Sequence, residues 1–243
     1  MKRFWDNAAV VPQPGGGFGV MLGGRPLRLP GGAPLRLPNL ALAEAVAVEW
    51  NAAGGGAKDA ETSLAEMPLT WLAGTAQDRI APGALPGAPG QAPLVEGLAQ
   101  YAATDLLCYR AEEPRLAAAE AAAWQPLLDW AARQLDAPLR VTAGLMPVPQ
   151  DPGALAALRC AVAELPPLEL AALGVLVPAL GSLVLGLAVL RGRLAADQAH
   201  ALSTLDERFQ ESAWGTDAEA LERRERIATE VAVAARLVAL SRG

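Results

Sequence analysis

The stretch Leu170–Leu190, LAALGVLVPALGSLVLGLAVL, decides the fold, because it is either a membrane span or the centre of a folded core. It holds no charged residue and is long enough in principle to cross a bilayer. Pro178 removes a helix hydrogen bond near the middle, and Gly181 with Ser182 has the pattern of a helix end followed by a new N-cap. We therefore predict two short buried helices and no membrane insertion.

The composition of the whole chain fits a folded protein with a sizeable core. The 243 residues are 52% hydrophobic and 19% charged, which excludes a disordered chain. A net charge of −6 provides no basic surface for nucleic acid. Cys108 and Cys160 are too few for a disulfide framework, and we expect both to be buried. His200 is the only histidine, which excludes a multi-histidine metal site, and no cofactor is expected.

The beginning of the chain differs from the rest. In the first 38 residues, paired glycines and X-Pro steps separate short apolar runs such as Phe18–Leu22, a pattern typical of a small β meander or a partial barrel. Asn39 can then cap a helix that carries Leu42, Val46 and Trp50 on one side. A second helix is expected over Leu69–Ile80.

After Pro93 the pattern is helical almost throughout. The predicted fold class is therefore α+β. We expect a small β-rich domain with one or two helices over residues 1–78, followed by a larger, mostly α-helical domain over residues 79–243. Pro114 and the pair Asp151–Pro152 each open a helix, and Pro126 predicts a break.

The end of the chain carries clear helix signals. Gly215 ends one helix, and Thr216 with Glu219 forms a capping box for the last one.

Asp105 stands out in the helical part. Leu94, Leu98, Tyr101, Asp105 and Cys108 recur at helical spacing, so the sequence predicts one continuous helix with a carboxylate in its apolar stripe. An unpaired buried carboxylate is costly. Two interpretations stay open: an internal hydrogen-bond network that includes a nearby Tyr or Thr, or a contact with another chain.

A search for catalytic motifs finds none with the required spacing. The glycines at Gly17 and Gly19 are not followed by the third glycine of a dinucleotide fingerprint. Asp197, His200 and Ser203 lie close in sequence but lack a nucleophile elbow. We therefore predict no catalytic residues, no metal site and no enzymatic activity.

One acidic helix offers a better candidate site. Asp206, Gln210 and Trp214 follow each other at intervals of four, and beside them Glu207 and Glu211 form a like-charge i,i+4 pair. Such a pair is tolerated when it faces basic groups, either arginines of the same fold or those of a partner; a solvated acidic face is the simpler alternative. The candidate partner-binding residues are Asp105, Asp206, Glu207, Gln210, Glu211 and Trp214.

Several segments also resemble, in order and spacing, a family of assembly chaperones of F-type ATP synthase that handle the α subunit. They are RFW (Arg3–Trp5), EW (Glu49–Trp50), MPLTWLAGTAQD (Met67–Asp78), TDLLCYR (Thr104–Arg110), WQPLLDWA (Trp124–Ala131), VTAGLMPVPQ (Val141–Gln150), LGSLVLGLAVLRGRL (Leu180–Leu194) and LDERFQESAWGTDAEA (Leu205–Ala220). The family typically reads LDGRPLKTP where this chain has the segment Leu22–Arg28. This segment departs from the family pattern, because the aspartate and the threonine of that pattern are missing.

The resemblance implies a non-enzymatic, ATP-independent chaperone. It would hold the unassembled α subunit and shield the surface that later faces the β subunit, with a β-rich domain before a helical one. Eukaryotic members act in the mitochondrial matrix. This chain has no Arg-rich transit segment and is rich in Ala, Gly and Arg with few lysines, so we expect a bacterial, cytoplasmic protein. The sequence leaves the oligomeric state open, and a monomer is the default expectation.

Two other classes of function compete with this interpretation. One is a small-molecule-binding or hydrolytic domain whose site residues are not recognised. The other is a peripheral membrane protein that uses Leu170–Leu190.

Overall fold

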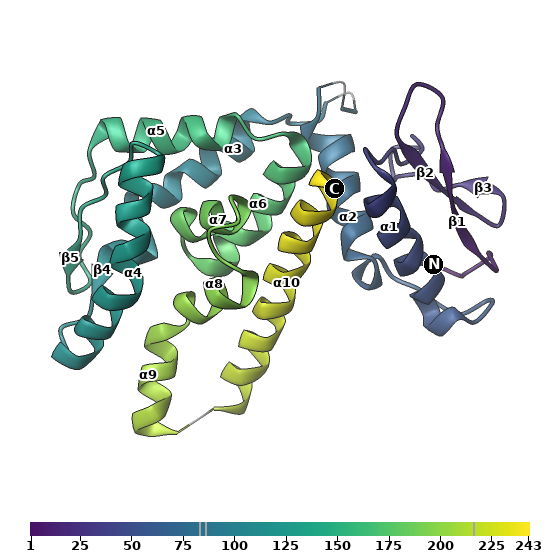
Figure 1. The fold of residues 1–243 in the computed structure, drawn as a ribbon. Helices are drawn as coiled ribbons and strands as arrows, with labels where there is room; N and C mark the ends of the chain where they lie inside the picture. Colours follow the sequence, from purple (N-terminus) through teal and green to yellow (C-terminus); the bar gives the residue numbers. More distant parts are fainter. Residues whose placement is uncertain (83, 86, 216) are drawn as a thin grey trace. The chain divides into compact units, whose positions relative to one another are not determined.

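The chain forms two compact units. The computed structural model describes residues 1–82, 84–85, 87–215 and 217–243, without the side chains of residues 213 and 214. Unit 1 contains residues 1–91, 167–172 and 236–243, and unit 2 contains residues 92–166 and 173–235. The predicted α+β class is confirmed, because short strands lie in the N-terminal part and helices make up most of the rest (Figure 1).

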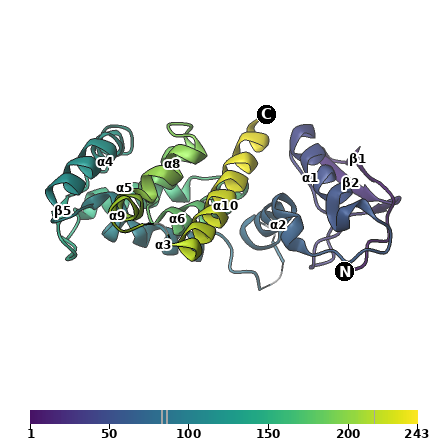
Figure 2. The same ribbon diagram turned by 90° about the horizontal axis from the view of Figure 1, so that it is seen from below.

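Unit 1 is built on a three-stranded antiparallel sheet in the order β1-β2-β3. Its strands are β1 (Ala8–Pro12), β2 (Phe18–Leu22) and β3 (Arg25–Pro26). In the register of the first pair, Val10 lies opposite Val20. Helix α1 (Leu40–Ala52) packs along β1 and β2, as both ribbon views show (Figures 1 and 2). The predicted β meander is thus confirmed.

Helix α1 begins as its sequence predicts. The Asn39 side chain accepts a hydrogen bond from the Leu42 amide at 2.9 Å, and Leu42, Val46 and Trp50 are buried. Helix α2 (Pro68–Thr75) ends earlier than predicted, and residues 76–80 continue it as a π-helical turn. A π turn of this kind re-aims the side chains that follow it.

Unit 2 is almost entirely helical, with one short parallel pair of strands, β4 and β5. Its central helix, α7, packs against α4 and α8. The first residues of α6 and the last residues of α10 belong to unit 1. The elements after α2 are α3 (Ala92–Ala99), β4 (Tyr109–Arg110), α4 (Pro114–Gln134), β5 (Thr142–Ala143), α5 (Pro152–Ala163), α6 (Pro167–Leu180), α7 (Leu183–Leu190), α8 (Ala196–Ser203), α9 (Leu205–Trp214) and α10 (Ala218–Arg242).

The long apolar stretch forms two helices, as predicted. Gly181 takes a left-handed conformation with φ of 65° and ends α6, and the Ser182 side chain caps α7 by accepting from the Leu185 amide. All eight residues of α7 are buried. Within the part of the chain that the structure describes, no helix combines the length and apolar character needed to cross a membrane.

Three local predictions are wrong. The helix expected from Leu94 to Cys108 ends at Ala99, and 3-10 turns follow it on both sides of Asp105, whose carboxylate caps the second turn. Helix α4 continues through Pro126; because this proline is exposed, water can hydrate the carbonyl group that loses its hydrogen bond. Cys160 is exposed, whereas Cys108 is buried as expected.

Two predictions concern parts that the structure does not describe. The capping residue Thr216 lies outside the described residues, and so does the side chain of Trp214.

Candidate functional site

The acidic side chains of α9 meet two arginines of α10. Glu207 Oε1 lies 2.7 Å from Arg223 Nη2, and Glu211 Oε1 lies 2.6 Å from Arg224 Nη2. The like-charge pair of α9 therefore faces basic groups of its own fold, one of the two possibilities that the sequence left open. These contacts tie α9 to α10 within unit 2.

The two ion pairs differ in burial. The Glu207 and Arg223 side chains are 41% and 51% exposed, whereas those of Glu211 and Arg224 are 20% and 8% exposed. An exposed pair contributes little to stability and can exchange partners, while a buried pair leaves a costly charge if one member is removed. Glu211 therefore holds the two helices together, and Glu207 is available at the surface.

Asp206, on the same helix, faces a second carboxyl group on α4. Glu120 is buried and accepts a hydrogen bond from the Ala111 amide at 2.7 Å. Burial raises the pKa of Glu120; the Ala111 amide lowers it, and a hydrogen bond with Asp206 and its charge raise it further. When Glu120 is protonated, its carboxyl group can donate a hydrogen bond to the Asp206 carboxylate, so the two groups act as a pair.

His200, on α8, lies near Glu207 and Arg224 and does not form a catalytic triad. Burial lowers the pKa of His200, and the positive charges of Arg208 and Arg224 lower it further. The Ser203 hydroxyl donates to the backbone oxygen of His200 at 2.9 Å, and Asp197 is exposed. The geometry therefore provides no nucleophile activated by this imidazole.

Several polar atoms of α8, α9 and α10 have no hydrogen-bond partner in the described part of the chain. Among the described residues, the buried side-chain nitrogen and oxygen atoms that have no hydrogen-bond partner are His200 Nε2, Asp206 Oδ1, Glu207 Oε2 and Arg224 Nη1. Buried polar atoms are normally paired, so a group of exceptions needs an explanation. We call these four residues, together with Glu120 and Glu211, the α9 cluster.

The remaining candidates on α9 divide into two. Gln210 is exposed, and its position on α9 places it next to the cluster. The side chain of Trp214 is not described, so its predicted anchoring role stays a prediction.

Asp105 lies apart from this cluster in its own hydrogen-bond network. Its side chain is 0% exposed. Oδ1 accepts from the Ser182 hydroxyl at 2.7 Å and the Leu107 amide at 3.1 Å, and Oδ2 accepts from the Val184 amide at 3.1 Å. Burial raises the pKa of Asp105, and these hydrogen bonds oppose the shift.

Of the two interpretations of Asp105, the structure therefore shows the internal hydrogen-bond network. Its donors are a serine and backbone amides, and not the expected Tyr or Thr. Because the Asp105 carboxylate has no exposed surface, it offers no direct contact to a partner in this structure.

Sequence reasoning missed the α4 contribution to the site. Leu116, Glu120 and Trp124 lie at i,i+4 spacing, and all three are buried on one stripe of α4. The Trp124 indole nitrogen donates to the Leu202 backbone oxygen at 3.0 Å, next to the start of α9. An acid in an apolar stripe, the same signal that singled out Asp105, could have identified Glu120.

Comparisons with known proteins give consistent results. A family model described as ATP12 chaperone protein matches residues 2–132. The crystal structure of Atp12 from Paracoccus denitrificans is 44% identical, covers 99% of this chain and 98% of that chain, and has a TM-score of 0.88.

Two further solved structures match over nearly the whole chain. A variant of the Paracoccus protein with an aspartate replaced by lysine is 44% identical, with 99% and 97% coverage and a TM-score of 0.87. A protein from Agrobacterium tumefaciens is 34% identical, with 100% and 86% coverage and a TM-score of 0.87.

Proposed function

Because the chain belongs to the ATP12 chaperone family, whose role is in ATP synthase assembly, we propose that it holds the free α subunit of ATP synthase. In this role it shields the surface of the α subunit that later faces the β subunit. The similarity over almost the entire chain to solved Atp12 structures is the observation that supports this proposal most strongly.

The physical requirements of such a role are modest. An unassembled subunit exposes an apolar surface that is prone to aggregation. A protein that holds this surface must bind it weakly enough for the true partner to displace it. Neither requirement involves nucleotide hydrolysis.

We place the contact at the α9 cluster and the exposed residues beside it. Glu207 and Gln210 are accessible. The ion pair between Glu207 and Arg223 is exposed, so Glu207 can pair with a basic group of the α subunit instead. Glu211 supports this surface by fixing α9 to the buried Arg224. Trp214 would add apolar area at the end of the same helix.

The proposal includes no catalytic step. Burial raises the pKa of the Cys108 thiol to about 12, so this group is not a thiolate nucleophile at neutral pH. We further propose that the chain works in the cytoplasm and as a monomer. Sedimentation equilibrium of the purified protein tests the monomeric state.

A light-scattering assay tests the contact surface. Purified α subunit is diluted from denaturant with wild-type protein, Glu207→Gln, or the matched control Glu164→Gln, whose acid lies at the exposed end of α5. We expect Glu207→Gln to suppress aggregation less well and the control to match wild type. Full suppression by Glu207→Gln at both low and moderate salt would remove this residue from the contact.

A further inference from the structure

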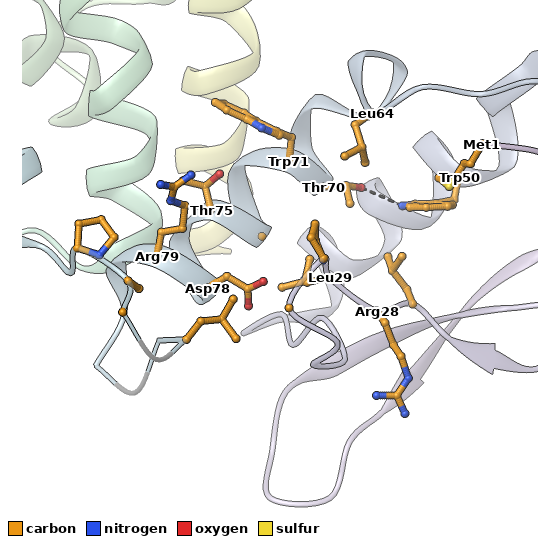
Figure 3. A pocket seen from close by; sticks show the side chains of 18 residues that line it. Met1, Arg28, Leu29, Trp50, Leu64, Thr70, Trp71, Thr75, Asp78 and Arg79 are labelled. Carbon is orange, nitrogen blue, oxygen red and sulfur yellow. Dashed lines mark hydrogen bonds between the residues drawn. The ribbon is translucent and has the colours of Figure 1, made fainter.

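Unit 1 contains a pocket that is separate from the α9 cluster. Its volume is about 640 Å³, and it lies between α2, the turn before α2, the segment after β3 and the loop after the π turn (Figure 3). Leu29, Leu64 and Trp71 contribute apolar wall. Gly74 allows this packing, because a Cβ at that position would lie 2.8 Å from Leu29 Cδ2.

The rim of this pocket presents large apolar side chains to solvent. Met1, Leu64 and Trp71 are 58%, 44% and 50% exposed, and all three line the pocket. Exposed apolar side chains grouped around a hollow are typical of a surface that binds a partner, and tryptophan is enriched where such contacts are strong.

One carboxylate points into this apolar space. Asp78 is only 9% exposed, and no described residue forms a hydrogen bond or ion pair with its side chain. Its backbone oxygen accepts from the Leu85 amide at 3.1 Å, which fixes the residue in place. Its side-chain oxygens are not among the buried atoms without a partner, so the carboxylate is open to the pocket and can accept from a donor that enters it.

The neighbouring arginines do not supply that donor. In Figure 3 the Asp78 carboxylate points toward Leu29, whereas the Arg79 guanidinium points the other way, toward Thr75. Arg28 donates to the Gly32 backbone oxygen at 2.6 Å and is exposed. The charged side chains that line the pocket are therefore two arginines, Arg28 and Arg79, directed away from Asp78, and the Asp78 carboxylate, which faces the apolar space.

The polar groups at the base of the pocket are already satisfied. The Thr70 hydroxyl donates to Glu49 Oε2 at 2.9 Å and accepts from the Trp50 indole nitrogen at 3.0 Å. Among the charged side chains of the lining, the Asp78 carboxylate is the one that faces the apolar space, so a positive group of a ligand in that space can pair with it.

We propose that this pocket binds an apolar peptide segment that carries a lysine or arginine, whose charged head pairs with Asp78. The apolar residues of the segment pack on Leu64 and Trp71. This site is distinct from the α9 cluster and gives the chaperone a second point of contact with unfolded or unassembled chains; it rests on the chaperone role but not on the identity of the α subunit.

Isothermal titration with short probe peptides tests the proposal. The probe is acetyl-Leu-Phe-Lys-Leu-Phe-amide, and its matched partner has glutamine in place of lysine. We expect the lysine peptide to bind wild-type protein about fivefold or more tightly than the glutamine peptide. Asp78→Asn should abolish this preference, and Trp71→Ala should weaken both peptides.

Two controls make the result decisive. Glu44→Gln removes an exposed acid of α1 that does not line the pocket, and it should keep the preference. Asp78→Asn should unfold near the wild-type melting temperature, because its carboxylate is open to the pocket and the substitution keeps the shape of the side chain. A large drop in its melting temperature would make Asp78 a structural residue and overturn the proposal.

Three binding results would contradict the proposal. Equal affinity of wild type for the two peptides, or a lysine preference that survives Asp78→Asn, would remove Asp78 from recognition. Hexylammonium binding as tightly as the lysine peptide would assign the pocket to small amines instead. Holding of the α subunit is measured separately, so failure here leaves the proposed function standing.

Discussion

Asp105 and Asp206 are both acids of unit 2 that lie against helices, but their surroundings are opposite. Asp105 is fully buried, and its oxygens receive donors from Ser182, Leu107 and Val184. Asp206 instead faces the carboxyl group of Glu120, and its Oδ1 is buried without a partner. The first acid is hydrogen-bonded on both oxygens, whereas the second leaves a polar atom unsatisfied.

The difference shows how position in the fold decides the role of a buried acid. The Asp105 carboxylate lies at the N-terminus of α7, where free amide groups and the helix dipole favour a negative charge. Asp206 lies in the first turn of α9, where the adjacent acid on α4 opposes that benefit. We expect the Asp105 region to resist change and the α9 cluster to respond to pH and partners.

The largest effect is expected at Asp105. Asp105→Ala leaves the hydroxyl of Ser182 and two buried amides without acceptors, so the free energy of unfolding should fall by about 3 kcal/mol or more. Asp105→Asn keeps the shape and part of the bonding, and should lose roughly 1–3 kcal/mol less. Urea denaturation measures both; equal stability of the two variants would show that the network contributes little.

A smaller effect should separate the two ion pairs of α9. Glu211→Gln leaves the buried Arg224 without its carboxylate and should cost about 2 kcal/mol. Glu207→Gln removes an exposed pair and should cost about 0.3 kcal/mol or less. The same denaturation experiment compares them, and equal losses would contradict the difference in burial.

The burial of Arg224 also decides what is expected when both glutamates are replaced. Two glutamates at i,i+4 spacing suggest that replacing both with glutamine leaves stability unchanged or slightly raised. Because Arg224 is only 7% exposed, the double variant should instead be destabilised.

The smallest effect is the pH dependence of the Glu120–Asp206 pair. Burial raises the pKa of Glu120 above its usual value of 4.5, so the folded state keeps a proton that the unfolded state releases. The stabilisation is therefore present below about pH 4.5 and is lost as pH rises through the folded-state pKa.

Glu120→Gln tests this sign, because it keeps a donor for Asp206 at every pH. The stability of wild type relative to Glu120→Gln should decrease from pH 4 to pH 8, measured by urea denaturation. Taking the difference between the two proteins removes the contribution of His200, whose lowered pKa acts in the opposite direction. A difference that stays constant with pH would mean that no proton is shared.

Local signals in the sequence predicted much of the fold. Asn39, Asp151 and Ser182 all cap helices as expected, because a cap depends on residues two or three positions away. The break at Gly181 followed from its tolerance of positive φ. Each of these features can be predicted from residues that are close in the sequence.

Contacts between residues far apart in the sequence could not be predicted in the same way. Ser182 and Val184 are 77 and 79 residues from Asp105, so the sequence showed that Asp105 needs partners without showing which ones. The burial of Arg224 likewise depends on how α10 packs with α9. Helical spacing also missed the change to 3-10 turns after Ala99, because the apolar period continues through it.

The central claim is that this chain holds the free α subunit, and a binding experiment tests it most directly. Immobilised wild-type protein is incubated with purified α subunit, washed, and then exposed to β subunit. The account predicts that α subunit is retained in the absence of nucleotide and released when β subunit is added. Failure to retain α subunit, or retention that β subunit does not reverse, would contradict it.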